Sequence, residues 1–134
     1  MKKLFLPVFI FGVTLALPAQ GNSDSLWSLW IDSRQADTVR LMAIQHLAWD
    51  LLYENPDSTF ALAQQELALA KKINNRKWQA KALNVIASTY NLRGNYAAAL
   101  ETYLEALDAM TASADKRGVA AISNNIGLVY RNMG

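Results

Sequence analysis

The chain has 134 residues, of which 52% are hydrophobic, and its formal net charge at pH 7 is +2. This length suits one modest domain, and the apolar fraction is sufficient for a packed core. The absence of cysteine excludes a disulfide framework and lipid attachment through cysteine. Alanine and leucine recur, glycine and proline are few, and no long stretch alternates apolar with polar residues, so the composition predicts an all-α protein.

The first segment has the layout of a secretory signal peptide. Two lysines precede an apolar run over residues 4–17, and the small residue Ala19 follows. The run is shorter than the ~20 apolar residues that a membrane span needs. We therefore expect residues 1–19 to be a signal peptide that is cleaved near Ala19, and the protein to be exported to the periplasm. The alternative is an uncleaved anchor, because Leu17 replaces the small residue usual three positions before the cut.

Removal of this segment changes the charge balance. The chain has 13 basic and 11 acidic residues, and Lys2 and Lys3 both lie in the expected signal peptide. The remaining chain then carries eleven residues of each sign and no polybasic cluster. This balance argues against nucleic-acid binding, and export further disfavours an RNA-binding helical repeat. We expect membrane contact only through an uncleaved signal or through a span located downstream.

The rest of the chain reads as helices joined by short turns. We expect residues 20–36 to form a linker and a short capping helix over "LWSLWIDSRQ". Asp37 or Thr38 is expected to N-cap a longer helix, which ends before Pro56 because the residue preceding a proline avoids the α region. The turn "NPDS" then caps the next helix, and Gly94 closes the helix after that. Two more helices are predicted on either side of "TASADK".

The predicted helices recur with a period of about forty residues. A shift of 40 residues places Ile86 on Ile126 and Tyr90 on Tyr130. A shift of 39 residues places the earlier helix around Leu47 on the same pattern. In the second helix of each pair, we align Ala61, Ala68 and Leu69 with Ala99, Ala106 and Leu107. Each unit is therefore expected to be a helical hairpin.

These residues resemble the tetratricopeptide repeat. The family pattern is a large residue, Leu-Gly or Leu-Ala, an aromatic residue three positions on, and then Gly, Ala, an aromatic residue and Ala. The second repeat supplies this pattern at Leu83, Ile86, Ala87, Tyr90, Gly94, Tyr96, Ala99, Tyr103 and Ala106. The first repeat is degenerate, with Leu51 and Gln65 in place of the aromatic residues. The resemblance implies an α-α superhelix of antiparallel hairpins over residues 37–134, with repeats at about 37–76, 77–116 and, incomplete, 117–134.

The repeat also departs from the family pattern. Its period exceeds the usual ~34 residues, and in this it resembles the N-terminal sensory arrays of bacterial signalling proteins. The last predicted helix carries an apolar stripe at Ile122, Ile126, Val129 and Met133. In an array of repeats such a stripe is covered by a further helix. We therefore expect an N-terminal fragment of a longer protein, and the alternative is self-association through this open end.

Enzyme chemistry finds no support in the residues. The only histidine is His46, and no second histidine or carboxylate is spaced to share a metal with it. We therefore expect no catalytic residue, cofactor or metal site within this chain. The resemblance instead implies a protein or peptide partner on the concave face, which the first helix of each repeat lines. The candidate groove residues are Gln45, Trp49, Lys81, Asn84, Ser88, Asn91, Asn124, Leu128 and Arg131.

Within this groove, Asn84 and Asn124 occupy equivalent positions in successive repeats. An asparagine ladder can hold the backbone of an extended peptide, because each amide offers a donor and an acceptor. The alternative is an ordinary solvated face, and the lysine–asparagine clamp with which some members hold a C-terminal carboxylate is not reproduced.

We expect an exported interaction module at the sensory front of a larger signalling protein. The alternative is the regulatory N-terminal part of a membrane-bound histidine kinase or nucleotide cyclase whose catalytic domain lies beyond residue 134.

Overall fold

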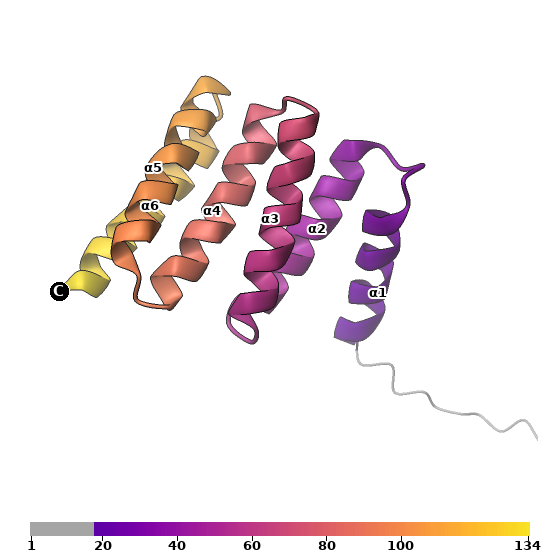
Figure 1. Ribbon diagram of the computed structural model, residues 1–134, viewed down its shortest axis with the longest axis horizontal. Coiled ribbons are helices and arrows are strands. Elements are labelled where there is room, and N and C mark those ends of the chain that lie inside the picture. The colour runs from indigo at the N-terminus through magenta and orange to yellow at the C-terminus, as the bar shows by residue number, and fades with distance from the viewer. Residues whose placement is uncertain (1–17) are drawn as a thin grey trace, which may run out of the picture.

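The computed structural model describes the backbone of residues 18–134 and the side chains of residues 22–134, a range that holds six α-helices and no β-strand. The helices are α1 (Pro18–Ile31), α2 (Asp37–Leu51), α3 (Pro56–Lys72), α4 (Arg76–Leu92), α5 (Tyr96–Ala112) and α6 (Lys116–Met133). Each helix packs against the next, and the row runs from α1 at one end to α6 at the other (Figure 1). The predicted all-α class is confirmed. The expected signal peptide lies outside the described residues, except for its last two.

The starts of α3 to α6 recur every twenty residues. The N-caps of these four helices are Asn55, Asn75, Asn95 and Asp115. The side-chain oxygen of each cap accepts a hydrogen bond from the backbone N–H three residues further on, which satisfies one of the free donors of the first turn. Two such intervals make one hairpin, so the local capping signals produce the forty-residue period. The predicted cap in "NPDS" is thereby confirmed.

The residue before each of the last three caps adopts a left-handed backbone conformation. These residues are Asn74 (φ 54°), Gly94 (φ 74°) and Ala114 (φ 55°). Gly94 directly follows Arg93, the C-cap residue of α4, as the sequence predicts for a glycine that ends a helix. Ala114 carries a Cβ atom, so this conformation costs it about 1 kcal/mol.

The two N-terminal helices differ from the sequence prediction. α2 starts after Ala36, and Asp37 lies inside its first turn, so neither Asp37 nor Thr38 is the N-cap. The Asp37 side chain instead accepts a hydrogen bond from Arg40, and its charge favours the N-terminal end of the helix. α1 extends back to Pro18, so the polar stretch expected to be a linker is helical. Trp27 is exposed and does not share the packed side of the helix with Leu26, which is buried.

The alignment proposed for the second helix of the first hairpin is wrong by two residues. The caps Asn55 and Asn95 set the register at forty residues. The buried residues of α3 are accordingly Thr59, Leu62, Ala63, Glu66 and Ala70, whereas Ala61 and Ala68 are exposed. Thr59 therefore corresponds to Ala99, Ala63 to Tyr103, and Glu66 to Ala106. The apolar pattern misled the prediction because this helix buries a glutamate.

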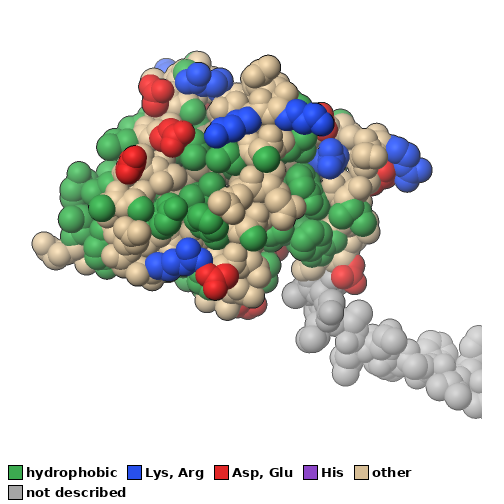
Figure 2. Space-filling view, viewed as in Figure 1, with side chains coloured by type: hydrophobic (Ala, Val, Ile, Leu, Met, Phe, Trp, Pro, Cys, Tyr) green, Lys and Arg blue, Asp and Glu red, His purple; other side chains and the backbone are tan. Residues whose placement is uncertain are grey.

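The core consists of two clusters that meet at α4. One cluster joins α1, α2, α3 and α4, and the other joins α4, α5 and α6. Ala87, Ala99 and Ala106 have no exposed surface and share one core cluster, so α4 and α5 pack closely through small side chains. On the face drawn in Figure 2, most charged side chains lie near the helix ends, with hydrophobic and neutral side chains between them. The first helices of successive hairpins also touch, because α4 contacts both α2 and α6.

Candidate functional site

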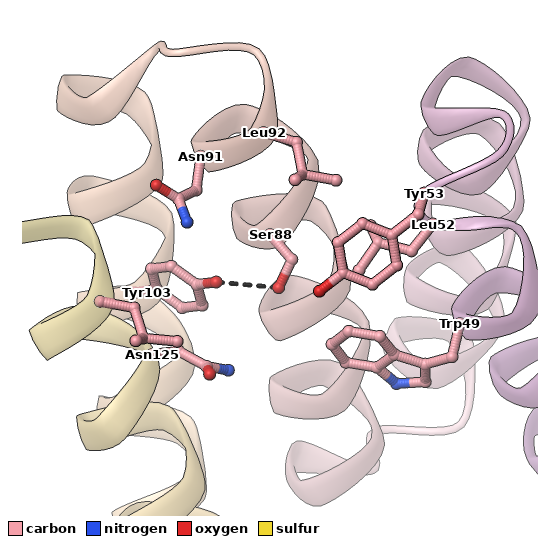
Figure 3. A pocket seen from close by; sticks show the side chains of 9 residues that line it. Trp49, Leu52, Tyr53, Ser88, Asn91, Leu92, Tyr103 and Asn125 are labelled. Atoms are coloured by element: carbon pink, nitrogen blue, oxygen red, sulfur yellow. Dashed lines mark hydrogen bonds between the residues drawn. The ribbon is translucent and has the colours of Figure 1, made fainter. Parts of the chain in front are cut away.

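A pocket of about 100 Å³ opens where α2, α4, α5 and α6 meet (Figure 3). Its walls come from the C-terminal end of α2, the last two turns of α4, and the middle of α6. A single residue of α5, Tyr103, also lines the pocket. The lining residues are Trp49, Leu52, Tyr53, Ser88, Asn91, Leu92, Tyr103, Asn125 and Leu128. All nine side chains are uncharged types.

The floor of the pocket is a hydroxyl pair. The Ser88 Oγ and Tyr103 Oη atoms are 2.8 Å apart, and the Ser88 hydroxyl donates to the backbone oxygen of Asn84 at 2.9 Å. A serine hydroxyl has a single proton, so the Tyr103 hydroxyl is the donor to Ser88. Tyr103 is only 2% exposed, and burial raises the pKa of its phenol above the ordinary value. The floor is therefore neutral at physiological pH, and its hydrogen bonds hold α5 against α4.

One side of the pocket is aromatic and partly open to solvent. In Figure 3, the rings of Trp49 and Tyr53 lie together on one side of Ser88. Tyr53 follows the end of α2 and is 81% exposed, which is unusual for so large a ring. Leu92, at the end of α4, is exposed as well. These side chains form an apolar surface that the chain itself leaves largely uncovered.

The other side of the pocket carries two amides, each engaged with a second amide. Asn125 Nδ2 donates to Asn84 Oδ1 at 2.9 Å, and Asn132 Nδ2 donates to Asn91 Oδ1 at 3.1 Å. Both bonds join α6 to α4 and fix the orientation of the amide planes. Asn91 and Asn125 lie on the side of Ser88 opposite the aromatic rings (Figure 3).

The structure brings some of the predicted groove residues together and separates others. Trp49, Ser88, Asn91 and Leu128 line the pocket, and Asn84 borders it through its bond to Asn125. The remaining four residues are not among the lining residues: Gln45, Lys81, Asn124 and Arg131.

Two features of the predicted groove take a different form in the structure. Lys81 lies with its Nζ atom 4.2 Å from the centre of the Trp78 ring. Of the two asparagines predicted to form a ladder for a peptide, Asn84 accepts a hydrogen bond from Asn125, while Asn124 is exposed. In the folded chain, the residues of α4 and α6 that bond to each other are 41 positions apart, one more than the forty-residue repeat. The difference arises because packing sets how far each helix is rotated about its axis.

Sequence reasoning missed five lining residues, which are Leu52, Tyr53, Leu92, Tyr103 and Asn125. Tyr53 lies four residues after Trp49, a spacing that places both on one helical face and so offered a signal. Tyr103 was identified from the sequence only as an aromatic residue of the repeat pattern, although it also lines the pocket.

Two other kinds of functional element are absent from the part of the chain that the structure describes. No group of three or more His, Asp or Glu side chains in that part could hold a metal ion. No helix there is both long and apolar enough to cross a bilayer.

Comparison with known families matches residues 78–134 to the model of the tetratricopeptide repeat. The match covers nearly all of α4 together with α5 and α6, where the sequence pattern is most complete. No curated protein and no solved structure matches the chain. The resemblance noted from the sequence is thus confirmed, and the six packed helices agree with a helical repeat protein of this type.

Proposed function

Because residues 78–134 match the model of the tetratricopeptide repeat, we propose that the chain is a protein- or peptide-interaction module that binds through the face formed by α2, α4 and α6. Repeats of this family generally serve as non-catalytic binding surfaces. One observation carries the proposal: α2, α4 and α6, which are the first helices of the three hairpins, all contribute residues to one pocket. Its exposed aromatic rings and oriented amides are the groups by which proteins commonly bind peptides.

The proposal extends to the location and context of the module. The N-terminal layout of two lysines followed by an apolar run supports export, with the repeats facing the periplasm. The long repeat period supports a place at the sensory front of a larger signalling protein, where partner binding would bias the packing of the repeats. Localisation of a fusion to alkaline phosphatase, which is active only after export, tests the first part. An inactive fusion would contradict it.

Peptide binding itself is tested with the purified chain and a phage-displayed library of random twelve-residue peptides. We expect selected peptides to bind the wild-type chain and to lose roughly tenfold or more of their affinity for the Trp49→Ala variant. The matched control is Trp27→Ala, which removes an exposed tryptophan from α1, outside the pocket. Failure to select any peptide, or equal losses in the two variants, would contradict binding at this face.

A further inference from the structure

The size of the pocket restricts what can enter it. Its volume of about 100 Å³ is well below the ~300–1,000 Å³ of sites for cofactors and drug-sized ligands. It has room for one side chain. Because its mouth is open, a ligand that places one side chain in it can continue across the surface. The shape therefore fits one residue of an extended chain.

The walls restrict the charge of that residue. The pocket is lined by Trp49, Leu52, Tyr53, Leu92 and Leu128 together with neutral polar groups. A carboxylate or ammonium group placed there would lose water and gain no opposite charge, which is strongly unfavourable. An apolar side chain would instead bury its own surface against the aromatic rings and leucines.

The polar side of the pocket complements a peptide backbone. The oxygen of Asn91 is occupied by Asn132, which leaves its amino group to donate a hydrogen bond. The amino group of Asn125 is occupied by Asn84, which leaves its oxygen to accept one. The pocket thus offers one oriented donor and one oriented acceptor. A peptide group needs the same pair, for its carbonyl and its N–H.

We infer that the pocket holds a single uncharged, apolar side chain of an extended partner peptide, whose backbone bonds to Asn91 and Asn125. The side chain packs against the rings of Trp49 and Tyr53 and against Leu128, which all line the pocket. This inference rests on the proposed function and adds the class of ligand. It assigns the anchor of the ligand to an internal apolar residue and not to a charged terminus or side chain.

The test uses the full chain and one peptide that binds it in the library selection. Each position of that peptide is replaced in turn by leucine, phenylalanine, aspartate and lysine, and affinities are measured by fluorescence anisotropy. We expect one internal position at which leucine or phenylalanine binds roughly tenfold or more tightly than aspartate and lysine. That preference should disappear in Trp49→Ala and persist in Trp27→Ala.

A charged variant provides an independent arm of the test. Leu128→Glu places a carboxylate in the pocket and should raise the affinity for the lysine-substituted peptide relative to the leucine peptide. Leu104→Glu, at an exposed position of α5, is the control for added charge and should leave the preference unchanged. Both variants should keep the circular dichroism spectrum of the wild-type chain, which checks that they are folded.

The outcomes separate the two proposals. Peptides that bind at the Trp49 site but tolerate a charge at every position would overturn the ligand class and leave the proposed function standing. The same holds if the charged terminus of the peptide proves to be the anchor. If no peptide distinguishes the wild-type chain from Trp49→Ala, both proposals fall.

Discussion

Glu66 is expected to make the stability of this protein fall as the pH rises. It lies on α3 at the position that Ala106 occupies in the next repeat, and none of its surface is exposed. Neither of its carboxyl oxygens has a hydrogen-bond partner among the described residues. Burial raises the pKa of Glu66 from 4.5 to about 8, and the positive charge of Lys81 offsets only part of this rise. At neutral pH the folded protein therefore holds Glu66 protonated.

The size of the effect follows from the difference in pKa between the two states. Below pH 4.5 the carboxyl is protonated in both the folded and the unfolded chain, so it contributes no pH dependence. Between pH 4.5 and about 8 the unfolded chain releases the proton while the folded chain retains it. The shift in the pKa of Glu66 lowers the free energy of unfolding by roughly 5 kcal/mol across this window, of which about 3 kcal/mol is lost by pH 7. Above pH 8 both states are ionised and the loss is complete.

The assay compares wild type with Glu66→Gln, which keeps the shape of the side chain and removes its titration. Urea unfolding followed by circular dichroism is measured at intervals from pH 4 to pH 9. Near pH 4 the two free energies of unfolding should agree to within about 1 kcal/mol. By pH 8 the variant should be the more stable by several kcal/mol.

Subtracting the free energy of unfolding of one protein from that of the other cancels the contribution of every other titrating group, because both proteins contain those groups. Among these is Asp32, whose pKa the hydrogen bonds from Arg34 lower to about 2. Glu101→Gln, at an exposed position of α5, should show no such trend. A difference between wild type and Glu66→Gln that stays constant with pH would refute the reasoning, because the buried group would then be paired or solvated.

Three further predictions concern stability and are tested by thermal unfolding. Gly127→Ala meets open space and should stabilise by about 0.5–1 kcal/mol, whereas a Cβ atom at Gly118 would lie 2.5 Å from the sulfur of Met110, so Gly118→Ala forces this buried side chain to move and should be the less stable variant by about 1 kcal/mol. The difference between the two variants is diagnostic, and equal effects would contradict the packing around α6. Ala114→Gly relieves the left-handed backbone and should stabilise by up to about 1 kcal/mol; a loss would show that the turn is not strained. Ala87→Trp should cost about 3 kcal/mol or more, and unchanged unfolding would contradict the close helix crossing.

The features readable from the sequence were those that depend on a few neighbouring residues. Asn55 and Gly94 define a helix start and a helix end through bonds that span three or four positions, so their roles were visible in the chain. The repeated tyrosines and alanines of the second repeat similarly indicated a helical hairpin, which α4 and α5 form. The same reasoning failed at Glu66, because nothing in the sequence indicates that this glutamate occupies the place of a buried alanine.

The sequence by itself determined the helical class, the repeat period and the resemblance to the tetratricopeptide repeat, because capping and helical periodicity are local. The tertiary structure alone decided which residues share the pocket. Tyr53 meets Ser88, and Asn125 meets Asn84, across gaps of 35 and 41 residues in the chain. Such contacts depend on how far each helix is rotated and shifted against the next. Rotation is fixed by the packing of whole helix faces, and a displacement of one residue turns a helix by about 100°.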